Sequence, residues 1–490
     1  MPERVVESTD TWDVVVIGGG PPGENAAQYA VQGSDRTAVI VEAELVGGEC
    51  SYWACMPSKA LLRPVDVLES VRALPGVAGA LSGSLDLEAV LARRDLFTHN
   101  HDDSSQVSWA TGIGIDVVRG WGRLAGVKRV EVAAPDGATR TLHARRAVVL
   151  ATGTTATVPP VPGLREAKPW TSRDVTNLHE VPERVAVIGG GVVACESTTW
   201  LKGLGAQAVT VIEPAPSLLA NQEPFAGELM AAQFDKLGIK VVLGSHVDAV
   251  QRLTVADTGI GRIHGGPATV TAGGSTFEVD ELVVAAGRTP RSAQIGLERV
   301  GIAVSGSHGY ITTDDQMAVI GADGWLYAVG DVCGRALLTH MGKYQGRIAG
   351  GVIAALAEGR PTDGSRYRDV ADHDMVPAVV FADPQVGSVG LTEAAARQKG
   401  IDVETIEHDL GSIAGAALLR DGYTGRAKLV VDRSSDTLVG ATFVGPDVAE
   451  LLHAATTAIV AKVSLETLWH VVPSYPTVSE IWLRLLESRG

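Results

Sequence analysis

The chain has 490 residues, of which 45% are hydrophobic, and its formal net charge is −16. At about 150 residues per domain, this length predicts about three domains with ample cores. The acidic balance and the aromatic fraction of 5% argue against nucleic acid as a partner, because such surfaces need clustered cations and stacking rings. The charged segment at 1–12 lacks an apolar targeting core, and no apolar run would span a bilayer, so we expect a cytoplasmic protein without membrane segments.

The first predicted elements, at 12–30, are a strand, a glycine-rich turn and a helix. Gly18, Gly20 and Gly23 follow the β-branched run, and the next predicted strand ends in Glu42. Glycines at these positions permit a tight turn and the close approach of a pyrophosphate to the helix N-terminus, and the acid can bind a ribose hydroxyl. The order of these elements therefore predicts a dinucleotide-binding unit.

A pair of cysteines, Cys50 and Cys55, comes next in the stretch "GGECSYWACMPSK". On a regular helix, positions five apart have Cα atoms roughly 8–9 Å apart, whereas a disulfide needs roughly 4.4–6.8 Å. A bond between them would therefore require the chain to leave the helix, which favours a bridge that can be opened. Pro57 suits the first turn of a helix, where the helix dipole and Lys59 would stabilise a thiolate at Cys55.

Three interpretations of this pair remain open: a redox pair, which we favour, inert core thiols, or a metal site. A metal would need further ligands, and Cys195 and Cys333 lie in other predicted elements without metal-ligand spacing. With four cysteines in total, the chain is not a disulfide scaffold. The bulky Tyr52 and Trp53 between the cysteines either narrow the access to Cys50 or pack against the first unit.

A second unit of the same kind begins at 184–196, where Gly189, Gly191 and Ala194 follow a predicted strand. The next predicted strand ends in Glu213, whose carboxylate would repel a 2′-phosphate and accept a hydrogen bond from a free 2′-hydroxyl. The segment 213–224 contains no arginine. This unit therefore predicts NADH as a cofactor in preference to NADPH.

The segments at 145–156 and 280–291 bracket the second unit as though it were inserted into the first domain. After the second unit, the chain returns to the first domain. The segment 324–335 contains a predicted strand that ends at Gly330 and Asp331. An aspartate in this position suits a hydrogen bond to a polyol chain, although it is also a common turn residue. Predicted antiparallel strands and helices follow from about residue 365.

These elements predict an α/β fold with two Rossmann-like dinucleotide-binding domains and a C-terminal α+β domain. The expected boundaries are a first domain at 1–160 and 289–364, a second domain at 161–288, and a third domain at 365–490.

The motifs and their order resemble those of the FAD-containing pyridine nucleotide–disulfide oxidoreductases. This family includes dihydrolipoamide dehydrogenase, glutathione reductase, mercuric reductase and the soluble transhydrogenase. The resemblance covers nearly the whole chain and extends to "ATG" at 151–153, "AAGR" at 285–288, "YAVGD" at 327–331 and "YPTVSE" at 475–480.

The resemblance implies FAD in the first site and a nicotinamide nucleotide in the second. The expected flavin-binding residues are Gly18, Gly20, Gly23, Glu42, Gly48, Lys59, Thr152, Gly153, Gly330 and Asp331, and the expected nicotinamide-site residues are Gly189, Gly191, Glu213 and Gly287. Cys55 would lie against the flavin and Cys50 would face the substrate, while Lys59 would pair with Glu196. The third domain would form a homodimer, so that Tyr475 and Glu480 would complete the site of the other subunit. Electrons would pass from NADH through the flavin to the disulfide.

The chain departs from the family at Tyr475, where disulfide reductases carry an acid–base histidine. Histidine titrates near pH 6.5 and tyrosine near pH 10, so an unperturbed phenol acting as base at pH 7 costs about 4 kcal/mol. His470 lies five residues upstream and does not align with the family histidine. It is therefore either an ordinary packing or surface residue or a substitute base.

We interpret the chain as an NADH-dependent homodimeric flavoprotein that passes electrons to a small acceptor, such as a quinone or another electrophile. One alternative is a dihydrolipoamide dehydrogenase-like enzyme in which Tyr475 or His470 acts as base. A second is a transhydrogenase with vestigial cysteines, and a third is a flavin-binding protein that turns nothing over. The chain lacks the C-terminal cysteines on which mercuric reductases depend, and we expect no metal site.

Overall fold

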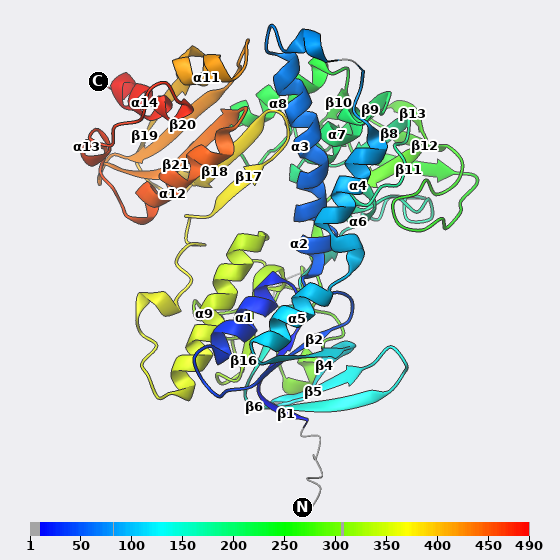
Figure 1. The fold of residues 1–490 in the computed structure, drawn as a ribbon, viewed down its shortest axis with the longest axis vertical. Coiled ribbons are helices and arrows are strands. Elements are labelled where there is room, and N and C mark those ends of the chain that lie inside the picture. Colours follow the sequence, from blue (N-terminus) through cyan, green and yellow to red (C-terminus); the bar gives the residue numbers. More distant parts are fainter. Residues whose placement is uncertain (1–9, 82, 305–307, 490) are drawn as a thin grey trace, which may run out of the picture. The chain divides into compact units, whose positions relative to one another are not determined.

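The computed structural model describes residues 10–81, 83–304 and 308–489, so most of the charged amino-terminal segment lies outside the described residues. The chain forms two compact units (Figure 1). Unit 1 comprises Met1–Tyr52, His99–Thr155 and Arg288–His373. Unit 2 comprises Trp53–Thr98, Ala156–Gly287 and Asp374–Gly490.

Unit 1 is built on one sheet with the strand order β3-β2-β1-β6-β5-β4, to which β16 adds beside β6. The strands are β1 (Thr11–Ile17), β2 (Ala38–Glu42), β3 (Ile115–Arg119), β4 (Trp121–Gly126), β5 (Arg129–Ala133), β6 (Thr139–Leu150) and β16 (Leu326–Ala328). β1, β2, β3, β6 and β16 run parallel, whereas β4 and β5 form an antiparallel extension. The sequences of parallel strands that are buried on both faces are continuous apolar runs. This burial explains why β1 is rich in valine.

Helix α1 (Pro21–Val31) lies alongside α9 (Thr339–Ala357) in unit 1 (Figure 1). The two backbones approach closely because α9 carries glycines at the contact. A Cβ atom on Gly346 would lie 2.4 Å from the Pro22 carbonyl oxygen, and one on Gly350 would lie 2.5 Å from that of Ala26. This packing fixes the position of the N-terminus of α1 at the carboxyl edge of the sheet.

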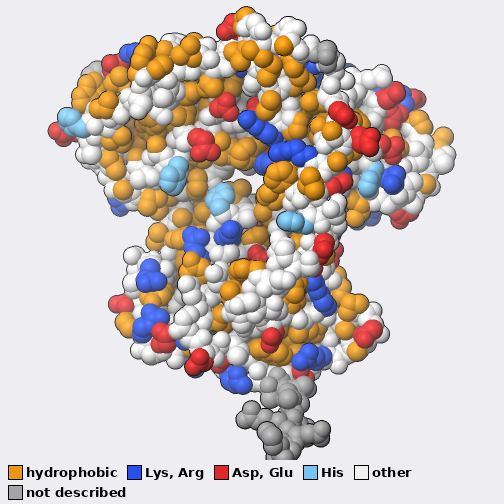
Figure 2. All heavy atoms as spheres, viewed as in Figure 1, with side chains coloured by type: hydrophobic (Ala, Val, Ile, Leu, Met, Phe, Trp, Pro, Cys, Tyr) orange, Lys and Arg blue, Asp and Glu red, His pale blue; other side chains and the backbone are white. Residues whose placement is uncertain are grey.

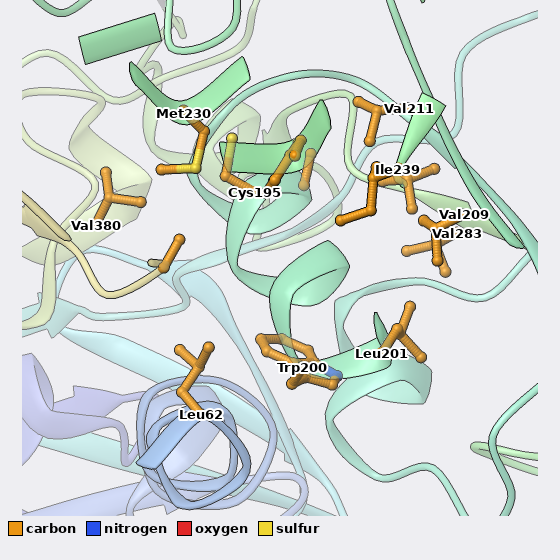
Figure 3. Packing of buried hydrophobic residues seen from close by; sticks show 14 of the residues in the cluster. Leu62, Cys195, Trp200, Leu201, Val209, Val211, Met230, Ile239, Val283 and Val380 are labelled. Atoms are coloured by element: carbon orange, nitrogen blue, oxygen red, sulfur yellow. The ribbon is translucent and has the colours of Figure 1, made fainter. Parts of the chain in front are cut away.

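Unit 2 contains a second parallel sheet with the order β10-β9-β8-β14. Its elements are β8 (Arg184–Ile188), α7 (Val192–Gly203), β9 (Ala208–Glu213), α8 (Pro224–Lys236), β10 (Lys240–Leu243) and β14 (Glu281–Val284). An antiparallel sheet of β11 (Val247–Arg252), β12 (Ala268–Ala272) and β13 (Ser275–Val279) accompanies it. Figure 3 shows the core that these elements share with α3 (Cys55–Arg72), in which Trp200 and Cys195 of α7 are buried.

The C-terminal part of unit 2 is an antiparallel sheet with the order β17-β18-β21-β20-β19. Its elements are β17 (Pro377–Val380), β18 (Gln385–Gly390), β19 (Val403–Asp409), β20 (Arg426–Asp432), β21 (Thr437–Gly445), α12 (Leu452–Val460) and α14 (Ile481–Arg489). Hydrophobic side chains gather over this part on the face seen in Figure 2. The predicted fold class, with two Rossmann-like domains and a C-terminal α+β domain, is confirmed.

The other helices and strands are short connecting elements. They are α2 (Gly48–Tyr52), α4 (Leu87–Phe97), α5 (Ser104–Gly112), β7 (Thr154–Ala156), α6 (Ser172–Thr176), β15 (Arg288–Pro290), α10 (Glu393–Gln398), α11 (Ala414–Leu419) and α13 (Leu465–Leu468). Over the described ranges, no helix has the length and apolar character needed to cross a membrane.

Candidate active site

The glycine-rich turn of unit 1 lies between β1 and α1, as its sequence predicts. Gly18 has a φ of 104°, and a Cβ atom there would lie 2.3 Å from the carbonyl oxygen of Ala151 at the end of β6. Gly20 is the N-cap residue of α1, and Gly23 lies in its first turn. Gly20 offers no side chain to cap α1, and because Pro21 and Pro22 carry no N–H, Gly23 supplies the first helical N–H that could bind a phosphate.

Glu42 at the end of β2 holds this turn through both of its carboxylate oxygens. Oε2 accepts a hydrogen bond from the Gly19 N–H at 2.6 Å, and Oε1 accepts one from the Glu44 N–H at 2.7 Å. Burial raises the pKa of the Glu42 carboxyl, and these two N–H donors act in the opposite direction. Gly48 is the first residue of α2 and lies beside this turn. A Cβ atom on Gly48 would lie 2.7 Å from the Cα atom of Gly20.

The opposite end of the expected flavin site centres on Asp331, which follows β16. The Thr154 hydroxyl donates to Asp331 Oδ2 at 2.7 Å, and Arg288 Nε donates to Thr154 Oγ1 at 2.5 Å. Burial raises the pKa of Asp331, while Thr154 and Arg288 lower it. The predicted residues Thr152, Gly153 and Gly330 lie on the same loops, and Thr152 donates to the Arg291 carbonyl at 2.8 Å.

Sequence reasoning missed Thr154 and Arg288 as members of this cluster. The signal was present, because Thr154 directly follows the "ATG" motif and Arg288 is the last residue of "AAGR". Their position beside Asp331 suits a network that orients one carboxylate oxygen and leaves the other for a ligand hydroxyl.

The carboxyl group of Glu24, in the first turn of α1, should make the free energy of unfolding depend on pH. Burial raises the pKa of Glu24 to about 7, a shift that Lys343 opposes and Glu42 reinforces. Since the folded pKa exceeds the unfolded value of about 4.3, the charged form destabilises the fold increasingly as the pH rises toward 7. We expect Glu24→Gln to be more stable than the wild type by about 1–3 kcal/mol at pH 8, and by much less at pH 5.

Urea unfolding of the purified protein at the two pH values measures this difference. Glu88→Gln in the exposed first turn of α4 is the matched control, because it removes a first-turn carboxylate without a buried environment. An equal stability gain for Glu24→Gln at pH 5 and pH 8 would contradict the prediction.

In unit 2, Lys59 of α3 and Glu196 of α7 form the predicted ion pair. Lys59 Nζ lies 2.7 Å from Glu196 Oε2, and the Phe381 N–H donates to Oε1 at 2.9 Å. The ammonium also lies 4.9 Å from the centroid of the Phe381 ring. Glu196 is buried, and these two donors compensate for the lost hydration of its carboxylate. Phe381 was missed because a backbone N–H leaves no sequence signal.

The second glycine-rich turn repeats the geometry of the first. Gly189 has a φ of 114°, and a Cβ atom there would lie 2.4 Å from the Ala285 carbonyl oxygen. Gly191 is the N-cap residue of α7, and Gly287 lies between β14 and β15 along the chain. Glu213 at the end of β9 accepts from the Ala215 N–H at 2.7 Å through Oε1. These residues can hold the pyrophosphate and one ribose of a nucleotide.

The two cysteines of the expected redox pair belong to different units along the chain. Cys50 lies in α2 of unit 1, and Cys55 is the first residue of α3 in unit 2. Both side chains are half-buried. The N-terminal position of Cys55, with Pro57 in the first turn, agrees with the placement expected from the sequence.

The bulky rings between the cysteines pack into the protein. Tyr52 is fully buried and its hydroxyl donates to the Val46 carbonyl at 3.0 Å. Trp53 is 8% exposed, and the Arg173 guanidinium lies 4.2 Å from its ring centroid. Tyr52 therefore packs within unit 1, as one of the two interpretations expects, whereas the observed contact of Trp53 lies within unit 2.

The other two thiols are core residues. Burial raises the pKa of Cys195, and it raises that of Cys333 to about 12, so both remain protonated near neutral pH. Among the residues that the structure describes, no three histidine, cysteine, aspartate or glutamate side chains form a group suited to a metal ion.

The C-terminal motif combines an exposed tyrosine with a buried carboxylate. The Tyr475 side chain is 74% exposed, and His470 is also exposed. Glu480 is 5% exposed, and its Oε1 accepts from Arg484 Nη2 at 2.7 Å and Nε at 3.2 Å. Its Oε2 is buried and has no hydrogen-bond partner within the described part of the chain. Arg484, which sequence reasoning missed, therefore supplies the observed partner of Glu480.

A cavity of about 370 Å³ in unit 2 adjoins the Lys59–Glu196 pair. Met56, Leu62, Phe97 and Phe381 supply its apolar walls, and its charged residues are Lys59, Arg63, Asp66, Arg93, Asp447 and Glu450. Its volume suits a small molecule.

Comparisons with known proteins identify the family of the chain. The sequence pattern of the family described as "Pyridine nucleotide-disulphide oxidoreductase" matches residues 12–348, and the pattern of its dimerisation domain matches residues 376–485. The chain is 30% identical over 476 residues to the dihydrolipoyl dehydrogenase of Chlamydia muridarum, with 96% of each chain covered. It is 32% identical to that of Chlorobaculum tepidum, with 96% and 95% covered. Among solved structures, the HOCl-induced flavoprotein disulfide reductase RclA of Escherichia coli is similar in fold, with a TM-score of 0.81, 22% identity, and 97% and 99% of the two chains covered.

Proposed function

Because the chain belongs to the FAD-dependent pyridine nucleotide–disulphide oxidoreductases, we propose that it oxidises NADH and passes electrons through FAD and a Cys50–Cys55 disulfide to a small acceptor. The chain is an oxidoreductase with a dimerisation domain. The proposal concerns the acceptor, the preference for NADH and the roles of the individual residues.

The observation that carries the choice of acceptor is the replacement of the family histidine by Tyr475. A phenol with a pKa near 10 is a poor base at pH 7, so exchange with a bulky dithiol would lack its usual proton carrier. Glu480, which orients that histidine in the family, is instead bound by Arg484. The reduction of a small electrophile, such as a quinone, depends less on a protein base. The cavity beside Lys59 has a volume suitable for such a molecule.

The residues of unit 1 fit FAD. The uncapped N-terminus of α1 can bind the pyrophosphate, Glu42 can reach a ribose hydroxyl, and the oriented carboxylate of Asp331 can bind the polyol chain. When bound, FAD supplies hydride transfer and stores two electrons. In unit 2, Glu196 holds Lys59 as a fixed positive charge, and by resemblance to the family this charge would act on the flavin.

The proposed preference for NADH depends on Glu213 in the second site. Its carboxylate would repel a 2′-phosphate, and the segment 213–224 has no arginine to neutralise one. We also propose that the enzyme works as a homodimer, since exposed Trp469, Val471 and Val472 belong to its dimerisation domain. A cytoplasmic location fits this proposal, because NADH and reducible thiols coexist there.

Anaerobic titration of the purified holoenzyme with NADH, followed by a panel of acceptors, tests the function. We expect one equivalent of NADH to produce a long-wavelength thiolate-to-flavin band, and quinones to be reduced much faster than dihydrolipoamide is oxidised. Comparable rates for quinone reduction and for dihydrolipoamide or glutathione disulfide turnover would overturn the choice of acceptor. NADPH activity equal to NADH activity would overturn the nucleotide preference.

A second candidate is a dihydrolipoamide dehydrogenase-like activity. It is favoured by the relatives at 30% and 32% identity that carry that name and by the retention of Glu480. Under this alternative Tyr475 or His470 would act as the base, and Tyr475→Phe or His470→Gln would lose dithiol turnover.

A further inference from the structure

Unit 1 contains two buried polar side chains to which the proposed function assigns no role. Gln345 of α9 and Asp369, which follows α9 along the chain, are both 0% exposed. Burying an amide or a carboxylate is costly unless hydrogen bonds replace the lost water. The bonds that these two side chains make therefore show what their burial holds in place.

Gln345 joins the loop of Asp331 to Asp369. Its Oε1 accepts a hydrogen bond from the Gly330 N–H at 2.9 Å, and its Nε2 donates to Asp369 Oδ2 at 3.1 Å. A backbone N–H can only donate, so it requires the amide oxygen to face Gly330 and the amide nitrogen to face Asp369. The result is a buried chain of hydrogen bonds that ends at the residue before Asp331.

Asp369 is itself held on several sides. Its N–H donates to the Asp315 carbonyl at 2.7 Å, and its Oδ1 accepts from the Asp372 N–H at 3.2 Å. Arg335 forms ion pairs with the side chains of both Asp315 and Asp372. Because both Asp369 oxygens accept N–H groups, this carboxylate cannot turn away from Gln345 without breaking a buried bond.

The turn at Gly330 is packed closely against α1. Gly330 has a φ of 76°, and a Cβ atom there would lie 2.8 Å from Pro22 Cγ. Gly342, three residues before Gln345 in α9, would place a Cβ atom 2.6 Å from the same Pro22 atom. Close packing and the bond to Gln345 together therefore fix the backbone from which Asp331 projects.

We propose that Gln345 and Asp369 are positioning residues for FAD, which hold the Gly330–Asp331 turn so that the Asp331 carboxylate is available to the polyol chain. This proposal rests on the part of the proposed function in which Asp331 binds that chain. Thr154 orients Asp331 through its side chain, whereas Gln345 acts through the backbone. Loss of either support should weaken the binding of FAD.

The surroundings of Asp369 allow the role of the amide to be tested with a proton. The titratable and charged groups near this carboxylate are Cys333, Arg335, Tyr344 and Asp372. Burial and the Asp372 charge raise the pKa of Asp369, whereas the bond from Gln345 and the Arg335 charge lower it. A glutamate in place of Gln345 would face Asp369 with a second carboxyl group, so the pair would have to share one proton.

The FAD dissociation constant at pH 5 and pH 8 tests this proposal, measured by diluting the holoenzyme and following the return of FAD fluorescence. The ratio of the Gln345→Glu constant to the wild-type constant should be about 10-fold higher at pH 8, where the shared proton is lost. Adding Asp369→Asn restores one donor facing one carboxylate, so this double variant should bind FAD within about threefold of the wild type at both pH values. Glu24 and His373 are present in every protein compared, so their titration cancels in these ratios.

The matched control is Gln316→Glu, which changes a glutamine of unit 1 whose amide donates to the Thr362 carbonyl. Its ratio should be the same at both pH values. In an Asp331→Ala background, Gln345→Glu should change the constant by less than about twofold, because the positioned carboxylate is gone.

Three results would overturn the proposal: a Gln345→Glu ratio that is equal at both pH values or is matched by Gln316→Glu, no recovery in the double variant, or a full effect in the Asp331→Ala background. These results leave the proposed function intact as long as Asp331→Ala by itself weakens FAD binding. If Asp331→Ala binds FAD as tightly as the wild type, the FAD-binding part of the proposed function fails, and this proposal fails with it.

Discussion

Tyr475→His is expected to raise dihydrolipoamide oxidation at pH 7 by about 100-fold, in the range that a positioned general base contributes. An unperturbed imidazole is a far better base at pH 7 than an unperturbed phenol is. The chain keeps a carboxylate at Glu480, whose Oε1 is bound by Arg484 and whose Oε2 is buried and accepts no hydrogen bond within the described residues. Steady-state assays with NAD⁺ and dihydrolipoamide measure the gain.

The matched control is Tyr475→Phe, which removes the hydroxyl and adds no base. We expect it to leave quinone reduction within about twofold of the wild type, because the proposed route does not use the phenol. A large loss of dithiol turnover in Tyr475→Phe would instead identify the tyrosine as the working base. No gain in Tyr475→His would mean that the acceptor preference has another origin.

Cys55→Ser is expected to lower turnover with acceptors that depend on the disulfide by about 10³-fold or more, as the loss of a reacting nucleophile does. The serine hydroxyl can neither form the disulfide nor exist as an anion near pH 7. NADH should still bleach the flavin, because Cys55 lies in neither glycine-rich turn. The long-wavelength band seen on anaerobic reduction should disappear.

Cys195→Ala is the control for Cys55→Ser, since it removes a thiol that is buried in the core of unit 2. Its turnover and its long-wavelength band should match those of the wild type. Quinone reduction that persists in Cys55→Ser would indicate that electrons leave from the flavin directly. Transhydrogenation between NADH and NADP⁺ at the wild-type rate in Cys55→Ser would favour the vestigial-cysteine alternative.

The two glycine-rich turns were predictable because their geometry depends on residues that are close in sequence. A strand, a turn that needs glycine and a helix N-terminus place Gly18 and Gly189 by local geometry alone. Glu42 and Glu213 follow at the next strand ends for the same reason. Local backbone preferences therefore determine most of these two sites.

The missed residues act through contacts between distant parts of the chain. Phe381 reaches Glu196 by a backbone N–H that any residue could supply, and Arg484 pairs with Glu480 where family resemblance led us to expect a catalytic role. The departure at Tyr475 was visible in the sequence. Its exposed position was not, and neither was the buried Glu480 Oε2, which has no hydrogen-bond partner among the residues that the structure describes.

The sequence by itself determined the fold class, the two glycine-rich turns and the absence of the family histidine, because each depends on residue type and short spacing. Only the tertiary structure decided that Tyr52 and Trp53 are packed and that Thr154 and Arg288 orient Asp331. These contacts join residues far apart in the chain, and their energies depend on burial and on the direction of donors, neither of which a linear pattern encodes.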